Sequence, residues 1–181
     1  HPAIRSLMKQ IHQRGHEVGL HPSFDAYLNA SVIGKEAETL KRVCEEEGVR
    51  QENWGGRMHY LRLRTPDTLR HWEASKMSYD SSLGYSDRPG FRCGTCYDYQ
   101  AFDPVSQRAL ELTVRPLIAM EVSILGDHYL GLDAGIEESL NMFILLKNRC
   151  RRVNGSFTLL WHNTSLVSQS QRRLYIAVLE G

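Results

Sequence analysis

Apolar residues recur at helical spacing in several stretches of the chain. In the first stretch, Pro2 suits an opening helical turn, and apolar side chains follow every three or four residues up to Ile11. Gly15 and Gly48 are typical stops after the first and second stretches. The predicted helices span residues 2–14, 32–47, 65–76, 136–153 and 166–179.

Short apolar runs between these helices predict β-strands at residues 17–20, 53–63, 77–81, 117–121 and 157–161. Residues 83–103 are rich in Gly, Asp, Tyr and Pro, and they predict a long structured loop that covers a site. Single helices separate most strands, which implies parallel pairing through right-handed crossovers. The sequence therefore predicts an α/β fold, a barrel or an open sheet, in one domain over residues 1–181.

Composition is that of an ordinary globular domain. The 181 residues are 41% hydrophobic and 24% charged, enough for a sizeable core. A formal net charge of +1 offers no electrostatic case for binding nucleic acid. Apolar runs fall short of the roughly 20 residues that a membrane helix needs, so we expect neither nucleic acid nor a membrane span.

The four cysteines do not resemble a disulfide scaffold in a chain of this size. Cys44 and Cys150 fall in helical patterns and are predicted to be buried thiols. Cys93 and Cys96 form a CxxC pair, but a loop-like stretch follows it, which favours a loop disulfide or paired buried thiols over redox catalysis. This usage favours a cytoplasmic location, and because the chain begins with His rather than Met, an extracytoplasmic one stays open.

His21 follows a short apolar run and precedes Pro22, as a residue at the C-terminal end of a strand does. In α/β barrels that end of the strand carries the chemistry. Asp25 lies four residues later, and imidazole nitrogens and carboxylate oxygens both bind zinc. The spacing indicates a metal site, with a simple loop carboxylate as the alternative for Asp25.

A second set of polar residues follows Gly55 and Gly56, which let the backbone approach a ligand closely. Strand alternation predicts that Arg57 and His59 share one face. Arg57 suits a bidentate bond to a carboxylate, and His59 suits a metal ligand or a proton carrier. The alternative is a half-exposed edge strand with a solvated basic face.

A third set ends the last predicted strand. His162 is a candidate general acid that protonates a leaving amine, with a hydrogen-bonded core histidine as the alternative. Leu160 and Trp161 precede it and are candidates for a small apolar substrate pocket or for the core.

Taken in order, these motifs resemble a known family, the polysaccharide deacetylases (NodB-homology, carbohydrate esterase family 4). The run Gly-His-Glu-Val-Gly-Leu-His at residues 15–21 is similar to the family's metal-binding motif. Arg-Met-His-Tyr at 57–60, Tyr-Asp-Ser-Ser at 79–82 and Leu-Trp-His at 160–162 resemble its later motifs. The order and approximate spacing agree over residues 15–164. The resemblance implies a distorted, incomplete (β/α) barrel and a bacterial polysaccharide, or its precursor, as substrate.

The resemblance also implies roles in a metal-assisted hydrolysis of an acetyl group. His21 would bind Zn²⁺ or another divalent transition metal. Asp25 stands where the family usually has a second histidine and would be an oxygen ligand. His59 replaces a proline and would supply a compensating ligand.

The same resemblance implies the catalytic set. Arg57 would orient the catalytic carboxylate, and the backbone N–H of Tyr60 would bind the oxyanion, a contact worth a few kcal/mol in the transition state. Leu160 would line the pocket for the acetyl methyl group, and His162 would be the general acid.

One departure stands out. The family's first motif, Thr-Phe-Asp-Asp-like, supplies the general base and the third metal ligand, and nothing similar precedes His21. Glu121 is a candidate for the missing carboxylate. We therefore expect a zinc-dependent deacetylase if that motif is supplied, or else a catalytically inactive relative that binds carbohydrate or protein. A barrel without its first strand exposes a sheet edge, which favours a homo-oligomer or a missing segment.

Overall fold

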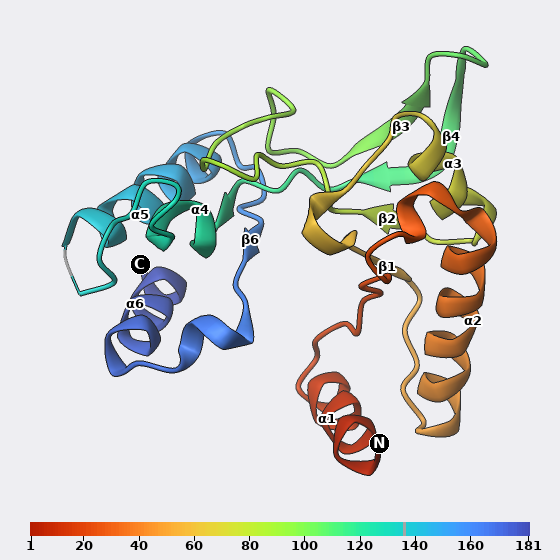
Figure 1. Ribbon diagram of the computed structural model, residues 1–181, viewed down its shortest axis with the longest axis horizontal. Helices are drawn as coiled ribbons and strands as arrows, with labels where there is room; N and C mark the ends of the chain where they lie inside the picture. Colours follow the sequence, from red (N-terminus) through yellow and green to blue (C-terminus); the bar gives the residue numbers. More distant parts are fainter. Residues whose placement is uncertain (136) are drawn as a thin grey trace. The chain divides into compact units, whose positions relative to one another are not determined.

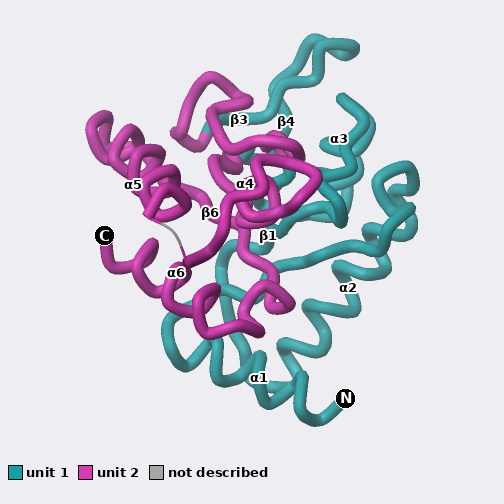
Figure 2. The backbone as a smooth tube through the Cα atoms, turned by 60° about the vertical axis from the view of Figure 1, so that its left-hand side comes forward, with its two compact units in different colours: residues 1–82, 99–114 teal, residues 83–98, 115–181 magenta. Residues whose placement is uncertain are grey.

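The computed structural model describes residues 1–135 and 137–181, which form two compact units (Figure 2). Unit 1 comprises residues 1–82 and 99–114, and unit 2 comprises residues 83–98 and 115–181. Of the described residues, none belongs to a helix long and apolar enough to cross a membrane, as the sequence predicts.

Unit 1 contains three helices and a mixed sheet (Figure 1). Its elements, in chain order, are α1 (Pro2–Gln13), a 3₁₀ turn (Ala26–Leu28), α2 (Ala30–Glu46), β1 (Gly55–Gly56), a second 3₁₀ turn (His59–Leu61), α3 (Asp67–Ala74), β2 (Tyr79–Asp80), β3 (Tyr99–Asp103) and β4 (Arg108–Val114).

The predicted helices of unit 1 are confirmed, with shifted ends. The Asn29 side chain caps α2 by accepting from the backbone N–H groups of Ser31 and Val32, so this helix begins two residues before the predicted start. Gly48 ends the same helix with a φ of +72°, a conformation that other residues adopt at a cost. Pro66, rather than the predicted Thr65, occupies the cap position of α3.

The sheet of unit 1 has the strand order β1-β2-β4-β3. The pairs β1–β2 and β2–β4 are parallel, which confirms the predicted pairing, whereas β3 and β4 form an antiparallel hairpin. The sequence analysis is wrong here, because it assigns β3 to the loop at 83–103. In β3 the apolar Phe102 is exposed while the charged Asp103 is buried on the same side as Ala101, so hydrophobic alternation gives no strand signal.

Two predicted strands of unit 1 are much shorter than expected. Of residues 17–20, only Leu20 is bridged, to Gly56. Of residues 53–63, only Gly55 and Gly56 pair as a strand, and a 3₁₀ turn follows at His59–Leu61. The predicted sharing of one strand face by Arg57 and His59 is therefore wrong.

The two glycines of β1 are required by close packing inside the protein. A Cβ atom on Gly55 would lie 2.3 Å from the Tyr79 ring, and one on Gly56 would lie 1.9 Å from the Leu20 carbonyl oxygen. The sequence analysis expects these glycines to admit a ligand. In the structure, the missing side chains instead leave room for other segments of the same chain, namely the Tyr79 ring and the Leu20 backbone.

The core of unit 1 lies between its helices and its sheet. Its fully buried large side chains come from α2, α3, the sheet and the connecting segments, and they include Ile33, Met58, Trp72, Met77 and Leu110. A smaller cluster joins Met8 of α1 to Cys44 of α2 and to Val49, which confirms the predicted burial of Cys44.

Unit 2 contains a small parallel sheet and three helices. Its elements are β5 (Ala119–Met120), α4 (Glu121–Leu125), α5 (Glu137–Arg152), β6 (Leu159–Leu160), a 3₁₀ turn (Asn163–Leu166) and α6 (Gln169–Glu180). The predicted strands at 117–121 and 157–161 are confirmed at their centres. The predicted helix at 136–153 matches α5, and its first residue, Ile136, lies outside the described residues. Ser168 and Gln171 form a capping box that begins α6.

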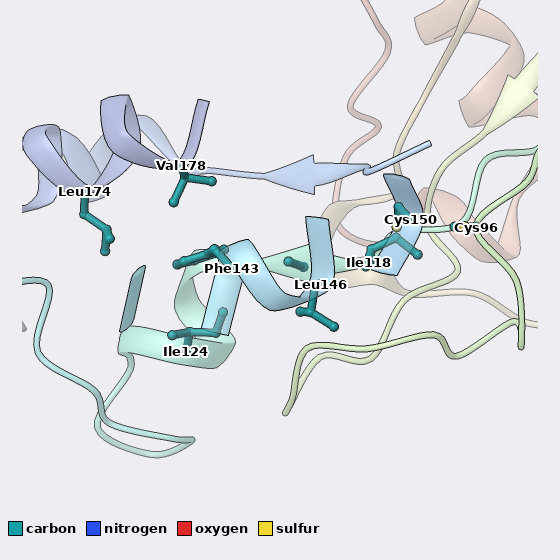
Figure 3. Packing of buried hydrophobic residues seen from close by; sticks show 9 residues of the cluster. Cys96, Ile118, Ile124, Phe143, Leu146, Cys150, Leu174 and Val178 are labelled. Carbon is teal, nitrogen blue, oxygen red and sulfur yellow. The ribbon is translucent and has the colours of Figure 1, made fainter. Parts of the chain in front are cut away.

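One hydrophobic cluster holds unit 2 together (Figure 3). Phe143 of α5 lies between Ile124 of α4 and the α6 residues Leu174 and Val178, and Leu146 of α5 extends the cluster towards Cys150. The unit is mixed α/β, as is unit 1. The incomplete (β/α) barrel and the single domain over residues 1–181 stay predictions.

Candidate functional site

His21 and His59 come together because of the bridge between Leu20 and β1. The Leu20 N–H donates to the Gly55 carbonyl at 2.8 Å, and the Arg57 N–H donates to the Leu20 carbonyl at 2.9 Å. Both histidines therefore follow paired backbone that runs in the same direction. This is the predicted position of His21 at the C-terminal end of a paired segment.

The two imidazole rings face each other with a defined proton arrangement. His21 Nε2 lies 2.8 Å from His59 Nδ1, and His21 Nδ1 lies 2.9 Å from the Arg57 carbonyl oxygen. A carbonyl only accepts, so His21 Nδ1 carries its proton and, in the neutral ring, Nε2 accepts a hydrogen bond from His59 Nδ1–H. A metal-binding histidine is oriented in the same way, through a bond from its second nitrogen.

The pair meets part of what a zinc site requires. Two nitrogens on one tetrahedral zinc ion, each about 2.0–2.1 Å from it, lie roughly 3.3–3.4 Å apart. The separation of 2.8 Å is close to that value, and a small ring movement would reach it. A third ligand is not in place, because the described residues contain no cluster of three or more His, Cys, Asp or Glu side chains suited to a metal.

Asp25, the predicted second ligand, is bound elsewhere. Its carboxylate accepts from the Arg62 guanidinium at 3.0 Å. Arg62 also donates to the Phe24 carbonyl and the Tyr27 hydroxyl, and its guanidinium lies over both aromatic rings. The structure therefore does not place Asp25 with the histidine pair.

Arg62 is a residue that sequence reasoning missed. The alternative of an edge strand would place Arg62 on a solvated basic face, yet its side chain is only 26% exposed. Because it binds three residues of the 24–27 segment, it holds the loop that follows His21. The available signal was the pair of aromatic rings at Phe24 and Tyr27, since arginine stacks readily on such rings.

Tyr60 occupies a strained turn next to the histidine pair. Its φ of +56° lies in the left-handed region, which an aromatic residue rarely adopts, and Leu61 follows with a φ of +53°. The Tyr60 side chain is 75% exposed, and its ring contacts the edges of the His59 and Phe24 rings. Residues with such a strained backbone conformation cluster at functional sites.

Arg57 is committed to the Tyr-Asp-Ser-Ser segment. Its Nε donates to the Ser81 carbonyl at 2.7 Å, and an Nη atom donates to the Ser81 hydroxyl at 3.0 Å. Desolvation lowers the pKa of Arg57, while the negative charge of Asp80 opposes that shift. The sequence analysis expects the Arg57 guanidinium to orient a catalytic carboxylate. In the structure it lies close to the carboxylate of Asp80.

Asp80 is that carboxylate, and the sequence analysis gives it no role. It is fully buried, and it accepts from the Ser82 hydroxyl at 2.5 Å and from the Ser82 N–H at 2.7 Å. The Ser82 hydroxyl in turn accepts from the Met58 N–H, which fixes the segment before His59. Burial raises the pKa of Asp80 to about 6, against the lowering effect of the Ser82 bonds and of Arg57.

Unit 2 contains a second pair, His162 and Glu121. Glu121 follows β5 and His162 follows β6, the strand paired with it in parallel. The Glu121 Oε1 atom lies 2.7 Å from His162 Nδ1 and accepts from the His162 N–H at 3.0 Å. An ionised carboxylate only accepts, so with Glu121 ionised Nδ1 carries the proton and Nε2 is the ring nitrogen that faces away from Glu121. The His162 side chain is 43% exposed, which allows that approach.

Glu121 itself is fully buried, and its second carboxylate oxygen has no protein partner. Leu160, half-buried in β6, pairs with Met120. Trp161 packs between the Phe143 and Tyr175 rings and donates to the Ser165 carbonyl. Its main contacts are thus with the core of unit 2.

The structure thus places the predicted residues in two groups, each within its own unit. His21, His59, Tyr60 and Arg57 lie together in unit 1, and His162, Glu121, Leu160 and Trp161 lie together in unit 2. Comparisons with models of protein families, with curated proteins and with solved structures found no match. The resemblance to the deacetylases therefore rests on the sequence motifs alone.

Proposed function

We propose that the chain is a metal-dependent hydrolase that removes acetyl groups from N-acetylated or O-acetylated sugars of a bacterial polysaccharide or its precursor. The observation that carries the proposal is the facing pair of His21 Nε2 and His59 Nδ1 at 2.8 Å. Two imidazole nitrogens directed at one point, one of them on a ring oriented by a backbone carbonyl, suit a shared divalent metal that would displace the proton between them.

In this proposal the residues of unit 1 bind the metal and the acetyl group. His21 and His59 would hold Zn²⁺, which would supply Lewis-acid polarisation of the acetyl carbonyl. The Tyr60 N–H would donate to the oxygen of that carbonyl as it gains negative charge. Arg57 and Asp80 hold the backbone around the two histidines in place through Ser81 and Ser82.

In unit 2, His162 is the candidate proton donor. Glu121 holds the Nδ1 proton and would stabilise the charged ring, which suits Nε2 for the role of a general acid. Leu160 is the candidate apolar contact of this unit, with Trp161 supporting it from the core. We further propose a carbohydrate partner and association with a second copy of the chain.

The first test is a calorimetric titration of zinc into chelator-stripped protein. We expect one-to-one binding by the wild type and loss of it in His21→Ala. His16→Ala is the matched control, since this exposed histidine lies five residues upstream, and it should bind as the wild type does. Zinc is expected to bind less tightly than in sites with three protein ligands. A folded wild type that binds no zinc would overturn the proposal.

A second candidate function is a catalytically inactive relative that binds carbohydrate. It is favoured by the lack of a third metal ligand beside the histidines among the described residues. Release of acetate from an oligomer of N-acetylglucosamine by zinc-loaded protein separates the two. Release lost in His162→Asn supports the enzyme, whereas retention of the oligomer without release supports the binding protein.

A further inference from the structure

Two cysteines that are distant in the sequence lie side by side in the core of unit 2. Cys96 belongs to the loop at 83–98, and Cys150 belongs to the last turn of α5. Both are buried, at 5% and 1% exposure, in the cluster shown in Figure 3. Figure 3 shows the two side chains next to each other at one end of this cluster.

The backbone that follows α5 is hydrogen-bonded to both cysteines. The Gly155 N–H donates to the Cys150 carbonyl at 2.9 Å, and the next N–H, of Ser156, donates to the Cys96 carbonyl at 3.0 Å. A Cβ atom on Gly155 would lie 2.3 Å from the Cys96 sulfur, so a glycine here makes room for that sulfur. Three segments therefore keep the two cysteines close together: the loop at 83–98, α5, and residues 155–156 that follow α5.

Cys93, the sequence neighbour of Cys96, is placed differently. It is half-buried, and its sulfur lies 3.7 Å from the Leu83 carbonyl oxygen, to which the thiol donates. The CxxC spacing suggests a bond between Cys93 and Cys96, but Cys96 belongs to the buried cluster that contains Cys150, and Cys93 does not.

We propose that Cys96 and Cys150 are a redox-active pair that closes into an intramolecular disulfide on reaction with a small-molecule disulfide. Access to the buried pair comes from local opening of the loop that carries Cys96. The bond would tie this loop to α5 and close a loop of roughly 50 residues, which restricts the unfolded chain. The inference does not depend on the proposed function.

The exchange balances without a further reactant. The Cys96 thiolate attacks one sulfur of the small disulfide, whose other half leaves as a thiolate with the bonding electrons. The Cys150 sulfur, on losing its proton, then attacks the Cys96 sulfur and expels the second half. Two protein thiols are oxidised, one disulfide is reduced, and the two released thiolates take up the two protons. Burial and the Cys96 contact raise the pKa of Cys150 to about 12, so the first attack falls to Cys96.

The test is peptide mapping by mass spectrometry, without reducing agent, after incubation of the folded chain with oxidised glutathione. We expect a cross-linked peptide pair containing Cys96 and Cys150, with the loss of two hydrogen atoms from the protein mass. Cys93→Ser should keep this cross-link, and Cys150→Ala should lose it. The oxidised wild type should also melt at a higher temperature than the reduced form.

The peptide map of the oxidised wild type tests the proposal even if a variant folds poorly. A cross-link between Cys93 and Cys96 as the main product would overturn it. Glutathione attached to Cys96 with no internal cross-link would overturn it as well, because the pair would then lack the geometry for closure. Oxidation of unfolded protein in denaturant is the control, and there the short CxxC loop should close preferentially.

Discussion

His21 Nε2 lies 2.8 Å from His59 Nδ1, although 37 residues separate the two histidines in the chain. The contact depends on one backbone bridge, between Leu20 and Gly56, which places His21 beside the turn that carries His59. It is the relationship on which the proposed metal site rests. Of the two other predicted ligands, His59 lies beside His21, whereas Asp25 is bound to Arg62.

His59 and Asp25 are expected to differ in their effect on zinc binding. His59→Ala removes a nitrogen that faces His21, and we expect it to weaken zinc binding by about 100-fold or more, since losing even an outer-sphere partner costs about 10–100-fold. Asp25→Ala removes a carboxylate that is paired with Arg62 and should change the affinity by less than about threefold. Calorimetric titration of both variants checks this. An equally large loss in Asp25→Ala would show that the carboxylate leaves Arg62 to bind the metal.

Asp80 should make the stability of the protein depend on pH. Its folded pKa of about 6 lies above the ordinary value of 3.8, so the folded state binds the proton more tightly. Its contribution is fully present below about pH 4 and is lost as the pH rises through 6. The shift corresponds to about 3 kcal/mol as an upper bound.

Asp80→Asn tests this pH dependence, because the amide does not titrate. We expect the difference in unfolding free energy between variant and wild type to move in favour of the variant as the pH rises from 4 to 7. Urea denaturation at a series of pH values measures it. A difference that stays constant over this range would show that Asp80 keeps an ordinary pKa in the folded state.

Glu121 is expected to select the tautomer of His162. A free neutral imidazole favours the proton on Nε2, whereas the carboxylate at 2.7 Å requires it on Nδ1. Nitrogen-15 NMR of the wild type at alkaline pH should report the Nδ1–H form. Glu121→Ala should shift the ring towards the Nε2–H form, while Glu121→Gln, which keeps an accepting oxygen, should preserve the Nδ1–H form. An unchanged tautomer in Glu121→Ala would exclude this orienting role.

Gly56 is expected to tolerate no side chain. In Gly56→Ala the new methyl group would meet the Leu20 backbone at 1.9 Å, so the bridge that positions His21 must shift. We expect a loss of about 3 kcal/mol or more in unfolding free energy, together with loss of zinc binding. Gly34→Ala is the control. This glycine lies inside α2 with its nearest side-chain atom 3.7 Å away, and alanine there should stabilise by about 0.5–1 kcal/mol. Thermal and urea unfolding compare the two, and a wild-type-like Gly56→Ala would rule out the steric account.

The sequence by itself determined the helices α1, α2, α3, α5 and α6 and the parallel pairing of the short strands, but not the short helix α4. Periodic apolar positions, a proline in the first turn at Pro2 and a stop at Gly48 act over a few residues, so they are readable without the fold. Local signals failed in the β3–β4 hairpin and after β1. In β3 the buried position holds Asp103, which is bound by Arg70, and after β1 the chain turns at Tyr60 through a left-handed conformation.

The partners of the site residues were decided only by the tertiary structure. His21 with His59, Glu121 with His162 and Cys96 with Cys150 are pairs from distant segments, and side chains find such partners only when the strands and helices have packed. The sequence pointed to the members of these pairs one by one, from the local setting of each, but not to which side chain each would contact. It misplaced Asp25 and left Arg62 and Asp80 unassigned, because an ion pair or a buried carboxylate is defined by what the fold brings beside it.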